Sequence, residues 1–250
     1  MKLQVIPIAT GIWCVRRPSY VACSYLVEDN GSLVAVDAGM DSDGSDFFDA
    51  LKSLGRPPAD VRAVLVTHWH NHHTAAAAAL KEKLGTRIYY SENEAPFLTR
   101  GTGQRGFRAW VSELLPEQGP LVLLKGLWEE APPRAVTASH LVEDGERIEG
   151  SFIAIASPGH TPGHMAYFHV PTRALFCGDA LVVVHDRLRL MSRPVTPDPV
   201  AARAAALDCL RTEPAFICPG HQGPLIHNVA SEVARMRSFL LGGDPWPLFG

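Results

Sequence analysis

The sequence predicts an α/β protein in which β-sheets are covered by helices and the loops at the strand ends gather at one edge. Short segments rich in Val, Ile and Leu alternate with segments of helical spacing along most of the 250 residues. Several predicted strands end in a tight turn that carries a histidine or an aspartate. With 46% hydrophobic and 20% charged residues, the composition is that of a globular chain with a sizeable core.

The sequence pattern of the first third of the chain predicts several strands and two helices. Val, Ile, Leu and Tyr predict strands at residues 3–8, 20–28, 33–37, 61–66 and 87–90. Asn30-Gly31 is a hairpin turn signal between the second and third of these strands. Apolar residues at helical spacing predict helices at residues 47–54 and 74–84, each followed by a glycine that ends it.

Residues 91–140 contain five prolines that interrupt patches of large apolar side chains. Loops that determine specificity sit at the edge of a rigid scaffold. We therefore predict that this segment is a pocket-lining insertion within one domain that spans residues 1–250. The large side chains expected to form the wall are Phe97, Phe107, Trp110, Leu114 and Trp128.

After residue 140 the strand pattern resumes. Strands are predicted at residues 152–156, 165–170, 175–177 and 216–218. Asp198 followed by Pro199 is typical of a helix start, so we expect a helix over residues 199–211. A last helix is predicted over residues 229–241, where two glycines end it.

Charge and cysteine content restrict the partners and the compartment. The net charge of -3 and the pI of about 6.4 give no general attraction to nucleic acid or to an anionic membrane. No apolar run approaches the roughly 20 residues of a membrane span, and the start lacks the apolar centre of a signal peptide. Five scattered cysteines without a Cys-x-x-Cys pair favour a reducing compartment.

We therefore expect a cytoplasmic protein with a small-molecule substrate, without nucleic acid or membrane as partner. The oligomeric state stays open, and a homodimer is compatible with the sequence.

Four of the 11 histidines fall within residues 68–73. The cluster follows a predicted buried strand and precedes a predicted helix, so it forms a strand-to-helix loop. Alternate residues of an extended segment point the same way, and His68 and His70 therefore place two imidazoles within reach of one metal ion. His72 and His73, at the start of the helix, can face a neighbouring point.

Three further turns follow strands and carry potential ligands: Ser157-Pro158-Gly159-His160, Gly178-Asp179 and Pro219-Gly220-His221. Proline and glycine fix sharp turns, which hold a ligand at a rigid strand end. Imidazole and carboxylate are ligands for zinc and also for iron or manganese. Each turn alone is a weak signal, but together with the histidine cluster they predict a metal site.

These motifs resemble the metallo-β-lactamase superfamily of metal-dependent hydrolases, from the Asp37 turn to the His221 turn. The family's Thr-His-x-His-x-Asp-His motif is similar to residues 67–73, and its Gly-His-Thr-x-Gly-His motif is similar to residues 159–164. The resemblance implies a four-layer αβ/βα sandwich with the site at one edge of the paired sheets. It also implies roles for the ligands: His68, His70 and His160 at a first metal, and His73 and His221 at a second metal, with Asp179 bridging. By the same resemblance, Asp37 supports the metal loop from the second shell without binding metal, and His164 is a supporting residue.

Two positions depart from the family pattern. Ala76 stands where the family has a glycine, which is a modest packing change. His72 replaces the motif's aspartate, which in the family binds the second metal. His72 can serve as a second-metal ligand or, outside the coordination sphere, as a proton relay, because imidazole titrates near neutral pH. It carries no negative charge, so we expect the second ion to bind more weakly, and a form with one metal stays open.

The resemblance implies a hydrolase that holds one or two Zn²⁺ ions, with iron or manganese as alternatives. In that chemistry a metal-bound hydroxide attacks the substrate. The chain looks closest to glyoxalase II-like and lactonase-like hydrolases, so we expect a small ester, thioester or lactone as substrate. Two other interpretations stay open: a mononuclear iron oxidoreductase of the persulfide dioxygenase type, and a non-catalytic metal-binding relative.

Overall fold

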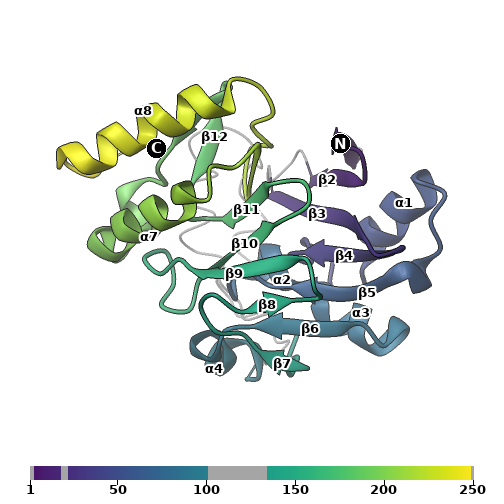
Figure 1. Ribbon diagram of the computed structural model, residues 1–250. Helices are drawn as coiled ribbons and strands as arrows, with labels where there is room; N and C mark the ends of the chain where they lie inside the picture. The colour runs from purple at the N-terminus through teal and green to yellow at the C-terminus, as the bar shows by residue number, and fades with distance from the viewer. Residues whose placement is uncertain (1–2, 18–21, 101–133, 249–250) are drawn as a thin grey trace, which may run out of the picture.

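Two β-sheets lie face to face in the computed structural model, with helices on the outer side of each (Figure 1). The structure describes residues 3–17, 22–100 and 134–248. The first sheet has seven strands in sequential order, which are β1 (Gln4–Ala9), β2 (Ile12–Arg17), β3 (Ala22–Asp29), β4 (Ser32–Val36), β5 (Val61–Leu65), β6 (Arg87–Tyr90) and β7 (His140–Leu141). The second sheet has the order β14-β11-β10-β9-β8, with β8 (Arg147–Ile148), β9 (Phe152–Ala156), β10 (Met165–His169), β11 (Ala174–Gly178) and β14 (Phe216–Pro219).

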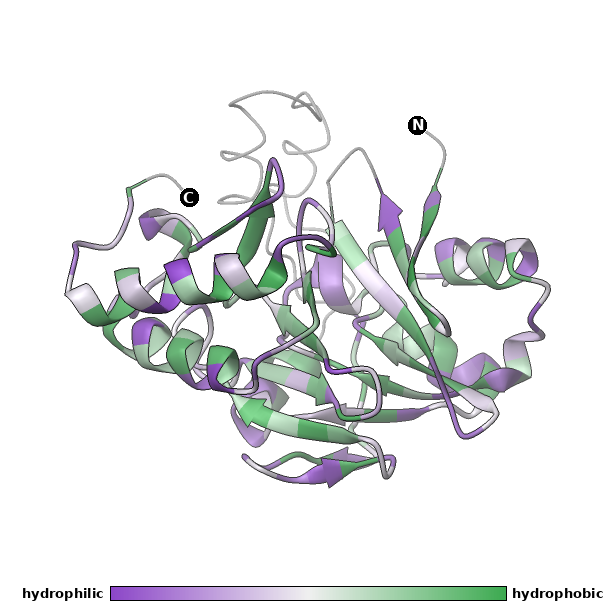
Figure 2. Cartoon of the chain, turned by 45° about the horizontal axis from the view of Figure 1, so that its top comes forward, coloured by the Kyte–Doolittle hydropathy of each residue, from purple (hydrophilic) through white to green (hydrophobic). Residues whose placement is uncertain are grey.

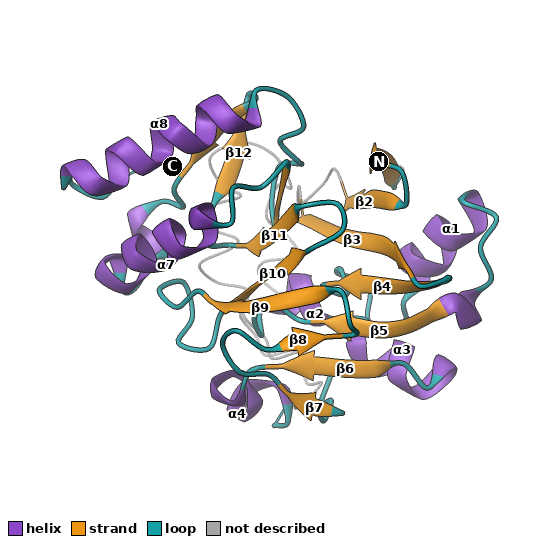
Figure 3. Cartoon of the chain, viewed as in Figure 1, coloured by secondary structure: helices purple, strands orange, loops and turns teal. Residues whose placement is uncertain are grey.

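The helices cover the two sheets from outside. The helices and single turns are α1 (Ser45–Ser53), η1 (Pro58–Asp60), α2 (Asn71–Thr74), α3 (Ala77–Leu84), η2 (Glu92–Glu94), α4 (Ala95–Leu98), η3 (Arg193–Val195), α7 (Pro199–Arg211) and α8 (Val229–Gly242). Helix α1 contacts β1 and β2, α3 contacts β6, and α7 contacts β9. Helix α8 contacts β13 (Arg187–Arg189), which forms a separate hairpin with β12 (Val182–Val184). Figure 3 shows α7 and α8 on the side of the second sheet and α1 on the side of the first.

Three hydrophobic cores separate these layers. The central core lies between the sheets, where Tyr25 and Leu65 of the first sheet meet Phe152 and Phe176 of the second. A second core joins the first sheet to α1 and α3, and a third joins the second sheet to α7 and α8. The strands are accordingly hydrophobic over much of their length, with helices flanking them on both sides (Figure 2). This confirms the predicted four-layer αβ/βα sandwich.

The carboxyl ends of several strands meet at one edge of the paired sheets. Strands β4 and β5 run parallel, β11 and β14 run parallel, and β9 has the same direction as β11 because both pair antiparallel with β10. Two backbone hydrogen bonds join the sheets at this edge, from Met165 N to Thr67 O and from Cys23 N to Gly220 O, each 2.8 Å long. The predicted ligand turns therefore start from a common, rigid edge.

Local sequence signals explain several elements. The Asn30-Gly31 turn is confirmed, because Asp29 pairs with Ser32 and both turn residues have positive φ, at 50° and 79°. The helix predicted over residues 74–84 is confirmed as α3 from Ala77 to its end before Gly85, but its predicted start is wrong, because α2 ends at Thr74 and two turn residues separate the helices. Ala76 N donates to Ala38 O, and Ala75 N is shared between Asn71 O, four residues back, and Gly39 O, so bonds to the 38–39 turn compete with the helical bonds at this point.

The predictions missed some strands. Strand β2 follows β1 after a two-residue turn, and its last two residues are arginines, which weaken the apolar pattern. Strands β12 and β13 have three residues each, and no strand is predicted from the sequence at these positions. These elements are stabilised by pairing, which a short local pattern does not reveal.

The predicted insertion at residues 91–140 stays a prediction. Phe107, Trp110, Leu114 and Trp128 lie outside the described residues. Phe97 of α4 is 39% exposed and stacks on Trp69, with ring centroids 4.7 Å apart. Within the described ranges, we find no helix of the length and hydropathy that a membrane crossing requires.

The start of α7 provides a test of the fold. The Asp198 carboxylate accepts hydrogen bonds from Val200 N and Ala201 N, at 3.1 and 2.9 Å, as the predicted N-cap. We expect Asp198→Ala to lower the free energy of unfolding by about 0.5–2 kcal/mol. The control Asp208→Ala, at an exposed position of the same helix, should change it by less than about 0.5 kcal/mol. Urea unfolding of both variants measures this, and equal losses would contradict the capping role.

Candidate metal centre

The predicted ligands come together as two adjacent groups at the carboxyl edge of the sheets. One group contains His68, His70 and His160, and the other contains His72, His73, Asp179 and His221. Within each group, one nitrogen or oxygen of every residue lies within 4.8 Å of those of the others. Every residue for which we predicted metal binding is therefore in one of the two groups.

The first group joins two strand-end loops. His68 and His70 follow β5, and His160 follows β9. His70 Nδ1 lies 3.1 Å from His68 Nε2 and 3.0 Å from His160 Nε2. Three ring nitrogens on two different loops thus converge on one point.

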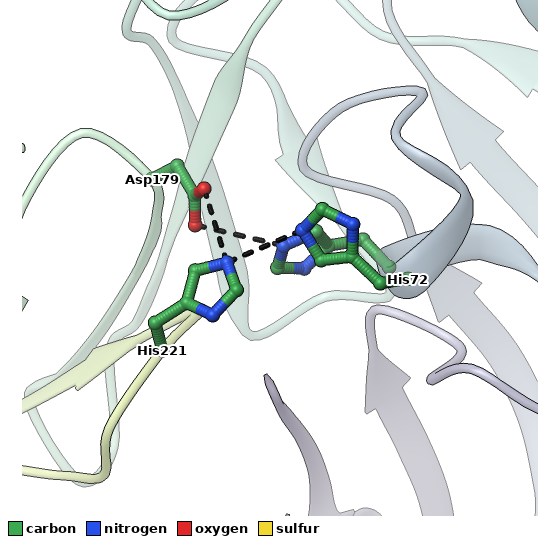
Figure 4. A group of neighbouring side chains, drawn as sticks. His72, Asp179 and His221 are labelled. Atoms are coloured by element: carbon green, nitrogen blue, oxygen red, sulfur yellow. Dashed lines mark hydrogen bonds and ion pairs between the residues drawn. The ribbon is translucent and has the colours of Figure 1, made fainter. Parts of the chain in front are cut away.

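The second group joins α2 to two turns of the second sheet. His72 and His73 lie in α2, Asp179 follows β11, and His221 follows β14. His72 Nε2 is 3.2 Å from His221 Nε2, which is 3.4 Å from Asp179 Oδ2. Figure 4 shows the side chains of His72, Asp179 and His221 pointing toward one another from these three elements.

Asp179 lies between the groups. Its Oδ2 is 3.5 Å from His160 Nε2 of the first group and 3.4 Å from His221 Nε2 of the second. Its backbone amide donates to His164 Nε2 at 3.0 Å, and His164 Nδ1 contacts Ser157 Oγ at 2.7 Å. His164 therefore supports the carboxylate from behind and lies outside both groups.

Hydrogen bonds on the far side of the rings fix which nitrogen faces the site. Asp37 accepts from Thr67 N and Thr67 Oγ1, at 2.8 and 3.0 Å, and lies 2.9 Å from His73 Nδ1. Since Thr67 Oγ1 gives its proton to Asp37, it accepts one from His68 Nδ1, at 2.9 Å. His160 Nδ1 donates in the same way to Val195 O at 2.6 Å. The Nε2 lone pairs of all three histidines are consequently directed into the centre.

One contact in the second group tests whether a cation fits. His73 Nε2 and Asp179 Oδ1 are buried, and among the described residues neither atom has a hydrogen-bond partner. They face each other at 3.6 Å. With the His73 proton on Nδ1, both atoms carry lone pairs, so their approach is unfavourable without a positive charge. A metal ion bound here would satisfy both atoms.

Burial keeps most of these imidazoles neutral. It lowers the pKa of His68 and His72 well below 6.5, and their histidine neighbours lower it further. Burial likewise lowers the pKa of His160 to about 4 and that of His164 to about 3. Burial would raise the pKa of Asp179, but His221 and His73 hold it well below its usual range. A neutral imidazole and an ionised carboxylate are the forms that bind metal.

Glycines at two of the turns permit the close approach of ligands. A Cβ on Gly220 would lie 2.3 Å from Asp179 Oδ1 and 2.5 Å from His73 Cε1. A Cβ on Gly178, which has a φ of 48°, would lie 2.6 Å from His164 Nε2. The glycine that precedes His221 and the one that precedes Asp179 are thus required by the packing of the centre.

Sequence reasoning missed two groups that contact the ligand loops. The Val195 carbonyl orients His160, and no local pattern marks a backbone acceptor 35 residues away. The buried Glu94 carboxylate accepts from Trp69 N at 2.7 Å and from Gly163 N at 2.8 Å. Its only signal in the sequence is an acidic residue directly before a predicted apolar patch, which is a common feature of exposed turns.

Comparisons with known proteins agree with this geometry. The sequence profile of the Metallo-beta-lactamase superfamily matches residues 21–221. The chain belongs to the metallo-beta-lactamase superfamily. It is 27% identical over 217 residues to the "Probable metallo-hydrolase YflN" of Bacillus subtilis, covering 78% of this chain and 76% of that protein.

Two further proteins are similar to this chain, one in sequence and one in fold. The "Hydroxyacylglutathione hydrolase GloC" of Haemophilus influenzae is 26% identical over 184 residues, which is 72% of each chain. The structure of TTHA1623 in a di-iron-bound form superposes with a TM-score of 0.62 at 24% identity, covering 87% of this chain and 94% of that one. That superposition shows a common fold.

The lowered pKa values predict how the metal-free protein responds to acid. His160 and His164 have a pKa of about 4 and about 3 when folded, against 6.5 in the unfolded chain. Below pH 6.5 the unfolded chain therefore binds protons that the folded protein does not, and stability falls with pH. Each histidine should lower the free energy of unfolding by about 2 kcal/mol between pH 6.5 and pH 5. Part of this loss is offset by His221, because Asp179 raises its pKa despite burial.

Urea unfolding of chelator-treated protein across this pH range measures the slope. The variant His164→Asn should have a shallower slope, because it removes one of the buried histidines whose pKa is lowered. The control His227→Asn changes an exposed histidine and should keep the wild-type slope. An unchanged slope in His164→Asn would show that this residue is not neutral in the folded state.

Proposed function

We propose that the protein is a metal-dependent hydrolase that acts on a small ester, thioester or lactone. The observation that carries the proposal is the pair of unpartnered atoms, His73 Nε2 and Asp179 Oδ1, which face each other at 3.6 Å within a cluster of imidazoles. The two atoms need a positive charge between them, which a metal ion held there would supply. A relative named as a hydroxyacylglutathione hydrolase supports an acyl substrate.

The residues suited to hold the ions follow the two groups. We assign His68, His70 and His160 to a first ion, and His72, His73 and His221 to a second. Asp179 is placed to bridge them, since Oδ2 lies within 3.5 Å of a nitrogen from each group. We propose Zn²⁺ as the ion, because imidazole with carboxylate is its common ligand set. Iron is the alternative, which the di-iron form of a protein with the same fold supports. When bound, such ions polarise a carbonyl oxygen and lower the pKa of a coordinated water toward neutrality.

The surrounding residues keep this centre in order. Asp37 holds the proton of His73 on Nδ1, and through Thr67 it determines the tautomer of His68. We therefore propose that Asp37 acts from the second shell, as the resemblance implied. His72 lies close enough to His221 to share an ion, so we assign it as a ligand in preference to a proton relay. We further propose that the protein works in the cytoplasm.

Metal reconstitution tests the proposal. We expect chelator-treated protein to be inactive and to regain hydrolysis of at least one ester, thioester or lactone when it is loaded with Zn²⁺, Fe²⁺ or Mn²⁺. The variant His160→Ala removes a ligand of the first group and should lower kcat/KM by more than about 100-fold. Full metal occupancy without hydrolysis of any substrate class would favour a non-catalytic relative. Oxygen uptake by the iron-loaded protein with a persulfide substrate would favour the oxidoreductase.

The second group provides a separate prediction. His72 stands where the family motif has a carboxylate, whereas the first group keeps the full set of the motif, so we propose that the second ion binds more weakly than the first. We expect His72→Asp to raise affinity at the second group by at least about tenfold, or about 1.4 kcal/mol, because it adds a negative charge beside the ion. Elemental analysis after dialysis, together with hydrolysis rates, measures the effect. The control His227→Asp makes the same change at an exposed position outside both groups. Two tightly held ions in the wild type and lost activity in His72→Asp would contradict the weakened second site.

A further inference from the structure

We propose that Glu94 is a positioning residue that holds the two ligand loops of the first metal group together. Glu94 lies in η2, directly after β6, and its side chain is fully buried. It touches no ligand ring by a hydrogen bond. Instead it binds the backbone on both loops, and this proposal rests on the proposed metal-dependent function.

The carboxylate connects residues that flank the ligands. Glu94 Oε2 accepts a hydrogen bond from Trp69 N at 2.7 Å, and Trp69 lies between His68 and His70. Glu94 Oε1 accepts from Thr161 Oγ1 and Gly163 N, both at 2.8 Å, and these residues directly follow His160. One side chain therefore bridges the loop after β5 and the loop after β9.

The close packing of the turn at residues 159–164 against Glu94 explains why two of its positions are a threonine and a glycine. A Cβ on Gly163 would lie 2.6 Å from Glu94 Oε1 and 2.5 Å from Ser91 Oγ, so only glycine allows the contact. Ser91 Oγ also donates to Gly163 O at 2.7 Å. Thr161 is 4% exposed, and its hydroxyl donates to Glu94. The threonine and the glycine of this turn are thus both fitted to the carboxylate.

Three donors require a carboxylate and not an amide. Trp69 N and Gly163 N are backbone donors that cannot reverse their role, and they approach different oxygens of Glu94. In a glutamine, one of these oxygens becomes an NH₂ group that faces an N–H. Glu94→Gln keeps the size of the side chain and breaks at least one charge-assisted bond.

The second group has its own supports. His73 is held by Asp37, and Asp179 is held through its amide by His164. The turn before His221 is fixed by the bond from Cys23 N to Gly220 O. None of these bonds involves Glu94, so its loss should act on the first group selectively.

Zn²⁺ titration against a chromophoric chelator tests the proposal in two backgrounds of the full chain. His221→Ala leaves the first group complete, and His160→Ala leaves the second. We expect Glu94→Gln to weaken Zn²⁺ binding about 10–100-fold in the His221→Ala background and less than about twofold in the His160→Ala background. A loss below twofold in the first background, or equal losses in both, would overturn the proposal.

The matched control is Glu149→Gln. Glu149 is also a buried carboxylate with three donors, Arg62 Nε, Arg87 Nη2 and Tyr89 OH, but it lies at the opposite end of β9 from His160. The Glu149→Gln variant should be less stable in urea and should keep the Zn²⁺ affinity of the unchanged background.

A second variant covers the case in which Glu94→Gln does not fold. Thr161→Val removes one donor to Glu94 and should still weaken Zn²⁺ binding at the first group by about threefold to tenfold. An unchanged affinity would overturn the proposal. Failure of both backgrounds to bind Zn²⁺ without any Glu94 change would instead refute the proposed function, and this inference with it.

Discussion

The centre depends on lone pairs that face one another across the edge of two sheets. His70 Nδ1 lies 3.1 Å from His68 Nε2 and 3.0 Å from His160 Nε2, and His73 Nε2 lies 3.6 Å from a carboxylate oxygen of Asp179. His68 and His160 donate on the far sides of their rings, so their Nε2 atoms carry no proton, and His70 Nδ1 is the one nitrogen of these three that can share one. Such an arrangement is unfavourable for the isolated side chains, so the scaffold must impose it.

The scaffold does so through rigid strand ends and backbone bonds. Parallel strands deliver their loops to a common edge, and the bond from Met165 N to Thr67 O connects that edge across the two sheets. The Tyr167 hydroxyl adds a second connection to Val66 O at 2.8 Å. Because the large central core lies directly below, a ligand loop cannot relax without disturbing packed side chains. The hydrophobic layers thus supply the stability that the polar edge lacks.

Sequence reasoning succeeded where chemistry is local. Each ligand candidate follows an apolar strand and a turn with glycine or histidine, and those signals lie within a few residues. It could not find Glu94, whose donors are 25, 67 and 69 residues away along the chain. The break between α2 and α3 was missed for the same reason, since it depends on carbonyls of the 38–39 turn. Long-range backbone contacts leave no periodic trace in the sequence.

His72 changes the balance of charge more than the geometry. Its Nε2 reaches the second group from α2, and each group then contains three imidazoles that share the carboxylate of Asp179. Two divalent ions would face a single negative ligand, which leaves more positive charge in the centre than a second carboxylate would. A nitrogen-rich set of this kind disfavours magnesium and calcium, which prefer oxygen, and favours zinc or iron. In the proposed hydrolysis, that excess charge would also strengthen the attraction for a carbonyl oxygen that becomes negative. Under the proposed function, the same substitution would therefore weaken the binding of the second ion and strengthen the stabilisation of developing charge.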